Sequence, residues 1–327
     1  MIRYGIVGTG WITDVFIEGA SMVEGLILSA VCSRDKDKAD NFAKKHNAPF
    51  AFTNYKEMAL SDKIDAVYIA SPNACHYEQS KFFLQNGKHV ICEKPITVKP
   101  EELQELQNLA KDKNLIYIEA TKMLYQPHRE IIKEALKKIE PITNARFDFS
   151  KVSSHYFRLL EGELPNVFNP KFGTGCLMDL GIYCVYPAID LFGKPKEIIN
   201  RAGMLPTGTD GFDNAIFIYD DKQVNITCSK VGSSVITSEI MGLYGSIKIG
   251  SISRFDDAVL VKEDGTEERL VEIFTGAELM KNEAEAFYRY ITDFDNYKEE
   301  YFKNSEITLT VNRVLKEMRD QAGISFE

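Results

Sequence analysis

The sequence predicts an α/β protein in which a doubly wound parallel sheet is followed by an α+β domain with an open, mostly antiparallel sheet. Up to residue 121, short and nearly all-apolar strands alternate with helical segments, which is typical of a parallel sheet covered on both faces. Beyond residue 121, longer segments alternate apolar and polar residues, as antiparallel strands with two unlike faces do. We therefore expect two domains, residues 1–121 and residues 122–327.

The composition fits two domains and narrows the class of protein. The chain has 327 residues, of which 44% are hydrophobic, so it can bury a sizeable core. Its formal net charge of -9 disfavours nucleic acid as a partner, because phosphate binding needs a basic surface. No apolar stretch approaches the ~20 residues of a membrane span, and no leader precedes the first strand. We expect a cytoplasmic protein with no membrane partner.

The cysteines and histidines give no sign of a metal centre. Six cysteines occur without a CxxC pair, and five histidines are scattered without a Cys/His cluster. Several cysteines lie inside apolar strands, where they resemble small buried hydrophobes of a reducing compartment. We therefore expect free thiols and no metal.

In the first domain, Asn86-Gly87 is a helix stop signal and Pro100 is a helix start signal. The expected strands are Arg3–Val7, Leu26–Cys32, Ala66–Ala70, His89–Cys92 and Ile116–Ile118, and the expected helices are Trp11–Ala20, Lys36–Lys45, Cys75–Asn86 and Pro100–Lys113.

The turn between the first strand and the first helix is the strongest functional signal. Gly8 allows a sharp turn and Gly10 lets the backbone approach a phosphate, while free N–H groups at the helix start face the anion. Thr13 stands where the complete motif has Gly or Ala. Because a second apolar strand follows at βαβ spacing, the turn indicates a Rossmann dinucleotide site. The residues expected to hold the pyrophosphate are Gly8, Thr9, Gly10, Trp11 and Ile12.

The residues after the second strand favour NADP over NAD. An NAD site usually has an acidic residue here that binds the ribose hydroxyls, whereas this strand ends in Ser33 and Arg34. Ser33 can donate a hydrogen bond to a 2′-phosphate, and Arg34 and Lys38 can supply positive charge. We expect NADP as the cofactor, with NAD as the alternative. In the competing interpretation, Arg34 is a solvated residue at a helix start.

A second loop follows the strand that begins at Ala66, at the edge where ligands bind in doubly wound sheets. It contains Ser71, Pro72, Asn73 and His76. Ser71 and Asn73 can cap the next helix, contact the cofactor ribose and nicotinamide, or do both. His76 taken alone is more typical of a structural histidine than of a catalytic one, although the loop as a whole is expected to touch the cofactor.

A third loop at this edge carries Glu93 and Lys94 before Pro95. The position of Lys94 directs its amine toward the nicotinamide crevice. Burial and the cofactor's charge can tune such an amine into a proton donor or relay.

The second domain begins with a helix that has Pro127 near its first turn and runs to Ile139. Strands are expected around 145–150 and 224–229, with hairpin turns at 220–222 and 264–265. The segment 242–249 is expected to be a turn that leads into another strand. Two amphipathic helices, around 284–294 and 307–318, close the chain.

One apolar segment of this domain carries a carboxylate and a phenol. If a helix begins near Cys176, Asp179 and Tyr183 are four residues apart and share one face. Together they can bind a hydroxyl group and exchange its proton. A core helix with an internal Tyr–Asp contact is the competing interpretation.

The motifs GTGWIT, SPNACH, EKP, EATKMLYQP, GTGCLMDLGIY and GLYGSIKI occur in this order and span nearly the whole chain. Together they resemble the glucose–fructose oxidoreductase / inositol dehydrogenase / MocA (Gfo/Idh/MocA) family. The tyrosine at 183 looks closest to the branch that contains dihydrodiol dehydrogenase, xylose dehydrogenase and glucose–fructose oxidoreductase. The resemblance implies an N-terminal Rossmann domain, a C-terminal sheet that often forms a subunit interface, and reversible NAD(P)-dependent oxidation of a secondary hydroxyl of a sugar, polyol or diol.

The same resemblance implies roles for individual residues. Lys94 corresponds to the family's catalytic lysine, Asp179 to its substrate-side acidic residue, and Tyr183 to its general acid/base. Glu119 lies in a segment expected at the domain junction near the cofactor. Met123 departs from the aromatic or arginine-rich residues that often follow this segment, which affects the expected substrate pocket rather than the chemistry.

Three further expectations concern partners and function. The alternating strands of the second domain predict a homodimer or homotetramer formed through the C-terminal sheet. His155, Arg158 and Asn169 can line the substrate pocket, but their types do not distinguish one carbohydrate-like substrate from another. A cofactor-sensing regulator on the same fold is the alternative function, which the joint presence of the lysine and the Asp/Tyr pair disfavours.

Overall fold

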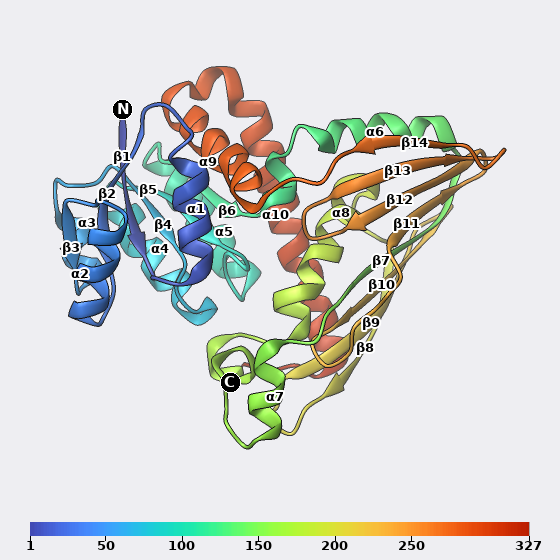
Figure 1. The fold of residues 1–327 in the computed structure, drawn as a ribbon, viewed down its shortest axis with the longest axis horizontal. Coiled ribbons are helices and arrows are strands. Elements are labelled where there is room, and N and C mark those ends of the chain that lie inside the picture. The colour runs from blue at the N-terminus through green and yellow to red at the C-terminus, as the bar shows by residue number, and fades with distance from the viewer. Residues whose placement is uncertain (327) are drawn as a thin grey trace. The chain divides into compact units, whose positions relative to one another are not determined.

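The computed structural model describes residues 1–326, which form two compact units (Figure 1). Unit 1 comprises Met1–Tyr125 and Thr275–Leu309, and unit 2 comprises Gln126–Phe274 and the chain from Thr310 onward. The first segment of unit 1 ends close to the domain boundary expected after residue 121. Residues 275–309, which were expected in the second domain, belong to unit 1 instead.

Unit 1 contains the expected parallel sheet. Among the described residues it has six strands in the order β3-β2-β1-β4-β5-β6, all parallel. The order reverses between β2–β1 and β4, which creates the crevice at the carboxyl ends of the strands where ligands of such sheets bind. The strands are β1 (Ile2–Val7), β2 (Leu26–Cys32), β3 (Phe50–Phe52), β4 (Ala66–Ile69), β5 (His89–Glu93) and β6 (Tyr117–Ala120).

The four helices expected in unit 1 are present, together with a short helix and two 3-10 turns that were not expected. They are α1 (Trp11–Ala20), α2 (Lys36–Lys45), α3 (Tyr55–Leu60), α4 (His76–Gln85) and α5 (Pro100–Asp112), with 3-10 turns at Asn73–Cys75 and Lys122–Tyr125. The strand β3 and the helix α3 were not predicted, since three and six residues carry too little periodicity to identify.

Helix α9 (Gly276–Thr292) belongs to unit 1 because it packs directly on α1. A Cβ atom added to Gly19 of α1 would lie 2.6 Å from the Lys281 nitrogen and 2.7 Å from the Ala277 oxygen. The two helix backbones therefore touch at a glycine. A capping box between Thr275 and Glu278 fixes the start of α9. Helix α10 (Phe294–Ala322) follows, and its residues up to Leu309 also belong to unit 1.

Unit 2 is built on an eight-stranded sheet, counted over the described residues, in the order β14-β13-β12-β11-β7-β10-β9-β8. The pair β7–β10 is parallel and the other pairs are antiparallel, so the expectation of a mostly antiparallel sheet is confirmed. The strands are β7 (Ile142–Ser150), β8 (Glu197–Met204), β9 (Asp210–Ile218), β10 (Gln223–Ser229), β11 (Ser238–Gly242), β12 (Gly245–Ser251), β13 (Asp256–Lys262) and β14 (Glu267–Val271).

Helices cover one face of this sheet (Figure 1). Helix α6 (His128–Ile139) contacts β11–β14, and α8 (Ile182–Phe192) contacts β7 and β10. The last part of α10 is attached to β8 by the amide of Gln321, which donates to the Ile198 carbonyl at 2.7 Å. On the other face, the part of the chain that the structure describes places no helix. The remaining helical pieces are α7 (Ser154–Leu160), 3-10 turns at Asn166–Phe168 and Pro170–Phe172, and a π-helix at Leu177–Gly181.

The segment 170–192 runs from the 3-10 turn at Pro170–Phe172 to the end of α8. It bears on the expectation that the chain has no stretch apolar enough to span a membrane. By length and composition it could cross a membrane, unlike any stretch anticipated from the sequence. However, 67% of its most apolar window is buried inside the protein, which is the pattern of a core segment.

Candidate functional site

The glycine turn after β1 has the geometry of a phosphate cradle. Gly8 has φ +107°, and a Cβ atom there would lie 2.4 Å from the Ala70 carbonyl oxygen. Gly10 is the N-cap of α1, and in the described chain only its sequence neighbours come within 4 Å of where its Cβ would be. The fold thus requires the first glycine, whereas the second leaves open space in front of the helix N-terminus. Buried Thr13 directs its hydroxyl to the Gly8 carbonyl at 3.3 Å.

The remaining residues expected around the pyrophosphate lie in the turn or at the start of the same helix. Thr9 and Ile12 are half-buried, and the side chain of Trp11, the first residue of α1, is 73% exposed.

At the end of β2, the nearest carboxylate is already engaged in the helix that follows. Asp35 is the N-cap of α2, and its Oδ1 accepts a hydrogen bond from the Lys38 backbone N–H at 3.0 Å. Arg34 and the Lys38 side chain are exposed, and Ser33 is half-buried. The position that holds the ribose-binding acid in NAD sites therefore presents a hydroxyl and two cations here.

The loop after β4 is held by a buried histidine. The ring of His76 is 0% exposed, with Nδ1 2.8 Å from the Pro95 carbonyl and Nε2 2.7 Å from the Ser71 carbonyl. Burial lowers the pKa of His76. His76 thus braces this loop against the one that carries Lys94, which is the structural role that its residue type suggested. Half-buried Pro72 and Asn73 lie in the same loop.

The expected helix capping by Ser71 and Asn73 is not found. The Ser71 hydroxyl donates instead to the Gln79 side chain at 2.7 Å, and neither the 3-10 turn nor α4 has a side-chain cap among the described residues.

Glu93 and Lys94 lie at the carboxyl end of β5, as expected. The Tyr68 hydroxyl donates to Glu93 Oε1 at 2.5 Å, and the Lys94 backbone N–H donates to Oε2 at 3.2 Å. Tyr68 is itself fixed by stacking on Phe16 of α1, with ring centroids 3.8 Å apart. Burial raises the pKa of the Glu93 carboxyl, while Tyr68 and the charge of Lys94 oppose that shift. The backbone of Lys94 is therefore fixed by its hydrogen bond to Glu93, which Tyr68 holds in place.

Two more carboxyl groups lie beneath this loop. Glu119 of β6 is buried, and its Oε1 accepts from the Ile96 backbone N–H at 2.7 Å. Glu283 of α9 is 0% exposed, and neither of its carboxyl oxygens has a hydrogen-bond partner within residues 1–326. Burial, followed by the charge of Glu93, raises the pKa of Glu283 well above its usual range, although Lys122 lowers it. Sequence reasoning missed Glu283, because it looks like any acidic residue of an amphipathic helix.

In unit 2, the acidic residue of the expected substrate wall has a buried cationic partner. Asp179 lies in the π-helix, and its Oδ2 is 2.8 Å from the Lys230 ammonium. Lys230 is 2% exposed, also donates to the Val167 carbonyl at 3.3 Å, and lies over the Phe168 ring at 5.0 Å. The Asp179 side chain remains 38% exposed, so its carboxylate is both fixed and accessible.

Tyr183 belongs to the first turn of α8, directly after the π-helix. Its half-buried ring packs edge-on against Phe149 of β7, with centroids 5.6 Å apart. The expected single α-helix from Cys176 is therefore wrong in its first turn, where five residues adopt π geometry. Such π turns occur frequently at functional sites.

The other polar residues expected in the substrate pocket have local partners. Arg158 pairs with Glu163, and the Asn169 side chain caps the next turn by accepting from the Lys171 N–H at 3.1 Å. His155 is exposed at the start of α7.

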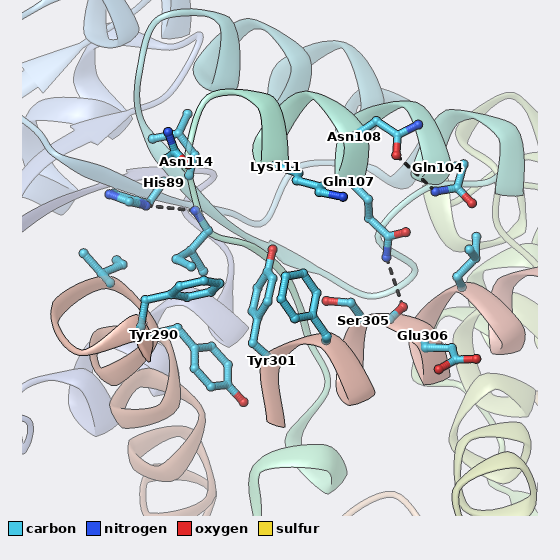
Figure 2. A pocket seen from close by; sticks show the side chains of 16 residues that line it. His89, Gln104, Gln107, Asn108, Lys111, Asn114, Tyr290, Tyr301, Ser305 and Glu306 are labelled. Carbon is cyan, nitrogen blue, oxygen red and sulfur yellow. Dashed lines mark hydrogen bonds between the residues drawn. The ribbon is translucent and has the colours of Figure 1, made fainter. Parts of the chain in front are cut away.

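Unit 1 contains a pocket of about 610 Å³ that residues of α5, α9 and α10 help to line. Figure 2 shows the side chains around it. Its walls include His89, the first residue of β5, and Ile116, which precedes β6, so it lies at the amino ends of these strands. Burial lowers the pKa of His89 to about 4, and its Nδ1 accepts from the Ile116 N–H at 2.9 Å. Because Gly8 and Lys94 lie at the carboxyl ends, this pocket is separate from the candidate dinucleotide site.

Comparison with known proteins assigns the chain to a family. Residues 2–121 match the GFO_IDH_MocA model, described as oxidoreductase family, NAD-binding Rossmann fold. The whole sequence is 39% identical over 326 residues to scyllo-inositol 2-dehydrogenase (NADP(+)) IolU of Bacillus subtilis, covering 100% of this chain and 98% of that protein. The chain belongs to the Gfo/Idh/MocA oxidoreductase family.

Further members of the Gfo/Idh/MocA family and further structures agree with this assignment. Trans-1,2-dihydrobenzene-1,2-diol dehydrogenase of Xenopus laevis is 30% identical over 264 residues, covering 79% of this chain and 78% of that protein. A 3-ketoreductase from Actinomadura kijaniata, solved with TDP-benzene and NADP, shares the fold with a TM-score of 0.81 at 19% identity, covering 98% of each chain. The protein is therefore an NAD(P)-dependent oxidoreductase, and the family predicted from its motifs is confirmed.

Proposed function

We propose that the protein is an NADP-dependent dehydrogenase that oxidises a secondary ring hydroxyl next to another hydroxyl, in a cyclic polyol, sugar or diol. The observation that carries this proposal is the full-length similarity to an enzyme named for NADP and scyllo-inositol. The second relative is named for a ring 1,2-diol, so both names describe a ring that bears neighbouring hydroxyl groups.

The preference for NADP is supported by the residues after β2. The carboxylate of Asp35, the N-cap residue of α2, accepts a hydrogen bond from the Lys38 backbone N–H and is therefore not free to bind a ribose 2′-hydroxyl. A 2′-phosphate would instead meet the Ser33 hydroxyl and the cations of Arg34 and Lys38. The open space at Gly10 admits the pyrophosphate in front of α1.

The proposed chemistry divides the work between cofactor and protein. Bound NADP supplies the acceptor for the hydride that leaves the substrate carbon. Tyr183 takes the proton of the substrate hydroxyl, and Lys94 assists by stabilising the phenolate or relaying the proton. Asp179, held as a carboxylate beside Lys230, accepts a hydrogen bond from a second substrate hydroxyl and so selects neighbouring hydroxyls. We also propose that these steps take place in the cytoplasm.

The first test is a titration of the purified protein with NADPH and NADH, followed by energy transfer to the reduced nicotinamide. We expect tighter binding of NADPH, and we expect Arg34→Ala to weaken NADPH binding by about 10-fold while leaving NADH unchanged. Glu24→Ala, a distant surface variant, is the control. Tighter binding of NADH would overturn the NADP assignment.

The second test follows NADPH formation with scyllo-inositol, other inositols, aldoses and cyclic trans-1,2-diols. Turnover with cyclic polyols or diols and weaker turnover with open-chain alcohols is the expected result. Tight NADPH binding without turnover of any hydroxylated ring would favour the cofactor-sensing alternative instead.

A further inference from the structure

Two thiols and a carboxylate from three separate elements meet in the interior of unit 2. Cys176 is the N-cap residue of the π-helix, whereas Asp213 of β9 and Cys228 of β10 are direct cross-strand partners. One ligand atom from each residue lies within 4.8 Å of the other two. All three side chains are 0% exposed. The sequence could not reveal this cluster, because its members are 37 and 15 residues apart (213 − 176 and 228 − 213).

A fourth buried group adds an independent observation. Asp210 is 0% exposed, and its Oδ2 accepts from the Leu177 backbone N–H at 2.5 Å. Its Oδ1 points at the backbone beside Cys176, since a Cβ atom on Gly175 would lie 1.9 Å from it. Within the described residues, no N–H or hydroxyl group donates to Asp210 Oδ1 or Asp213 Oδ2, and the two carboxyl groups interact with each other. Two buried carboxyl groups that interact must share a proton or bind a cation, and the two neighbouring thiols favour a metal ion as that cation.

We propose that Cys176, Asp213 and Cys228 bind a zinc ion in unit 2, with Asp210, which interacts with Asp213 but lies outside this set of ligand atoms, moving in as the fourth ligand. Zinc takes four ligands in tetrahedral geometry and accepts thiolate together with carboxylate ligands, at about 2.0–2.3 Å. Ligand atoms within 4.8 Å of one another can reach this geometry with small side-chain adjustments. Magnesium and calcium are disfavoured because they require oxygen ligands throughout. On binding, both thiols release their protons to solvent and coordinate as thiolates, and the proton that the two carboxyl groups hold is released as well.

The position of this zinc site gives it a structural role. Its ligands come from the start of the π-helix and from the two strands beneath it. Asp179 lies three residues after Cys176 (179 − 176), so zinc would clamp the substrate-side segment to the sheet. A closed site without solvent access fits a structural ion rather than a catalytic one, which keeps an open position.

The experiment measures the metal content of full-length protein produced in zinc-supplemented medium and dialysed against a weak chelator. We expect about one zinc per chain in the wild type, and less than about a tenth of that in Cys176→Ser and Asp213→Asn. Cys184→Ser is the matched control, because Cys184 is equally buried in unit 2 but does not belong to the cluster. Replacement of zinc by cobalt should produce thiolate-to-metal charge-transfer absorption in the wild type and in the control.

Two results would overturn the proposal. Wild-type protein that retains no zinc and shows no cobalt–thiolate absorption would mean that Asp210 and Asp213 share a proton instead. Zinc retained at full occupancy by Cys176→Ser would place the ion elsewhere. If that variant does not fold, the wild-type zinc content and cobalt spectrum still decide the question, since both require intact thiolate ligands.

Discussion

The pairing of Asp179 with Lys230 determines the charge on the proposed substrate-side wall of unit 2. Lys230 is almost fully buried and is surrounded by the Asp179 carboxylate, a backbone carbonyl and an aromatic ring. A buried ammonium is tolerated only when it is paired in this way. The partnership could not be predicted from sequence, because Lys230 lies at a strand end and is separated from Asp179 by 51 residues.

Removal of Lys230 should therefore affect substrate recognition rather than cofactor binding. We expect Lys230→Met to lower kcat/KM by about 10-fold or more, and the double variant with Asp179→Asn to be little worse than either single variant. A double-mutant cycle on kcat/KM measures this coupling. Lys222→Met, which removes the partner of exposed Asp221, is the control. If the losses in kcat/KM of the two single variants add fully in the double variant, Lys230 and Asp179 do not act together.

Substitution of the residues proposed to act on the substrate proton should lower kcat without changing cofactor affinity. Lys94→Ala and Tyr183→Phe should each reduce kcat by about 10²–10⁴-fold, the usual contribution of a positioned acid or base. Their dissociation constants for NADPH should remain close to that of the wild type, as measured by nicotinamide fluorescence. Equal losses of cofactor binding and turnover in both variants would show that these side chains support the fold instead.

Among the elements, the β1–α1 turn separates two roles of glycine that the sequence motif combines. Gly8 adopts a left-handed conformation against the Ala70 carbonyl, whereas Gly10 has φ −83° and open space. The motif alone predicts that both are needed, but only the coordinates tell which one the fold itself requires.

We expect Gly8→Ala to destabilise the protein by about 1–3 kcal/mol, because it combines a positive φ with a backbone clash. Gly10→Ala should melt within a few degrees of the wild type but bind NADPH at least about 10-fold more weakly, since the added methyl group occupies phosphate space. Thermal melting and fluorescence titration of both variants test this contrast. If Gly10→Ala binds NADPH as tightly as the wild type does, the β1–α1 turn is not the phosphate-binding site.

Helix α9 places an unpartnered carboxyl group in the core of unit 1, and this has a consequence for stability. The raised pKa of Glu283 keeps the group neutral when folded, while the unfolded chain ionises it above its ordinary pKa of 4.5. The stabilisation that this group provides is complete below that pH and is lost as the pH rises toward the folded pKa.

Glu283→Gln should therefore be more stable than the wild type near pH 8 by about 1–3 kcal/mol, with a difference that shrinks toward pH 4. Denaturant unfolding of both proteins at several pH values measures it, and Glu285→Gln on the same helix is the control. A difference that does not change with pH would mean that Glu283 is ionised in the native state.

The elements that could be predicted from sequence are those that carry their own pattern. The bounds of β2, α1 and α2 agree with the prediction, because apolar runs and capping residues delimit them locally. The parallel pairing of β7 with β10 could not be foreseen, since alternation shows two unlike faces but not strand direction. The π-helix was missed for a similar reason: one added residue per turn leaves no local signal in a five-residue segment.

For the whole molecule, the uncovered face of the eight-stranded sheet supports the proposed self-association. On β8 and β9, Ile199 and Ile216 are cross-strand partners, 41% and 36% exposed, and Phe212 is 43% exposed. Alternation along β9 directs Ala215 and Phe217 into the core and Phe212 and Ile216 outward. Exposed apolar side chains clustered on a flat sheet are typical of an interface.

We expect Ile216→Lys to convert the proposed oligomer to a monomer near the chain mass of 37.1 kDa, because a lysine repeated across a two-fold interface introduces buried charge. Sedimentation velocity at micromolar concentration provides the measurement. Ile27→Lys, at a similarly exposed isoleucine of unit 1, should leave the mass unchanged. A wild-type protein that sediments as a monomer would contradict the proposed assembly.

The packing of α9 on α1 also constrains the order in which the protein can be completed during synthesis. The ribosome delivers β1–β6 first, yet the surface around Gly19 that receives α9 stays bare until residues 276–292 emerge. The whole of unit 2 up to Phe274 is translated in the meantime. The dinucleotide-binding half therefore reaches its final form only after residues 126–274 have been translated, and a nascent chain released before that point would expose an apolar helix face for chaperones or proteases to recognise.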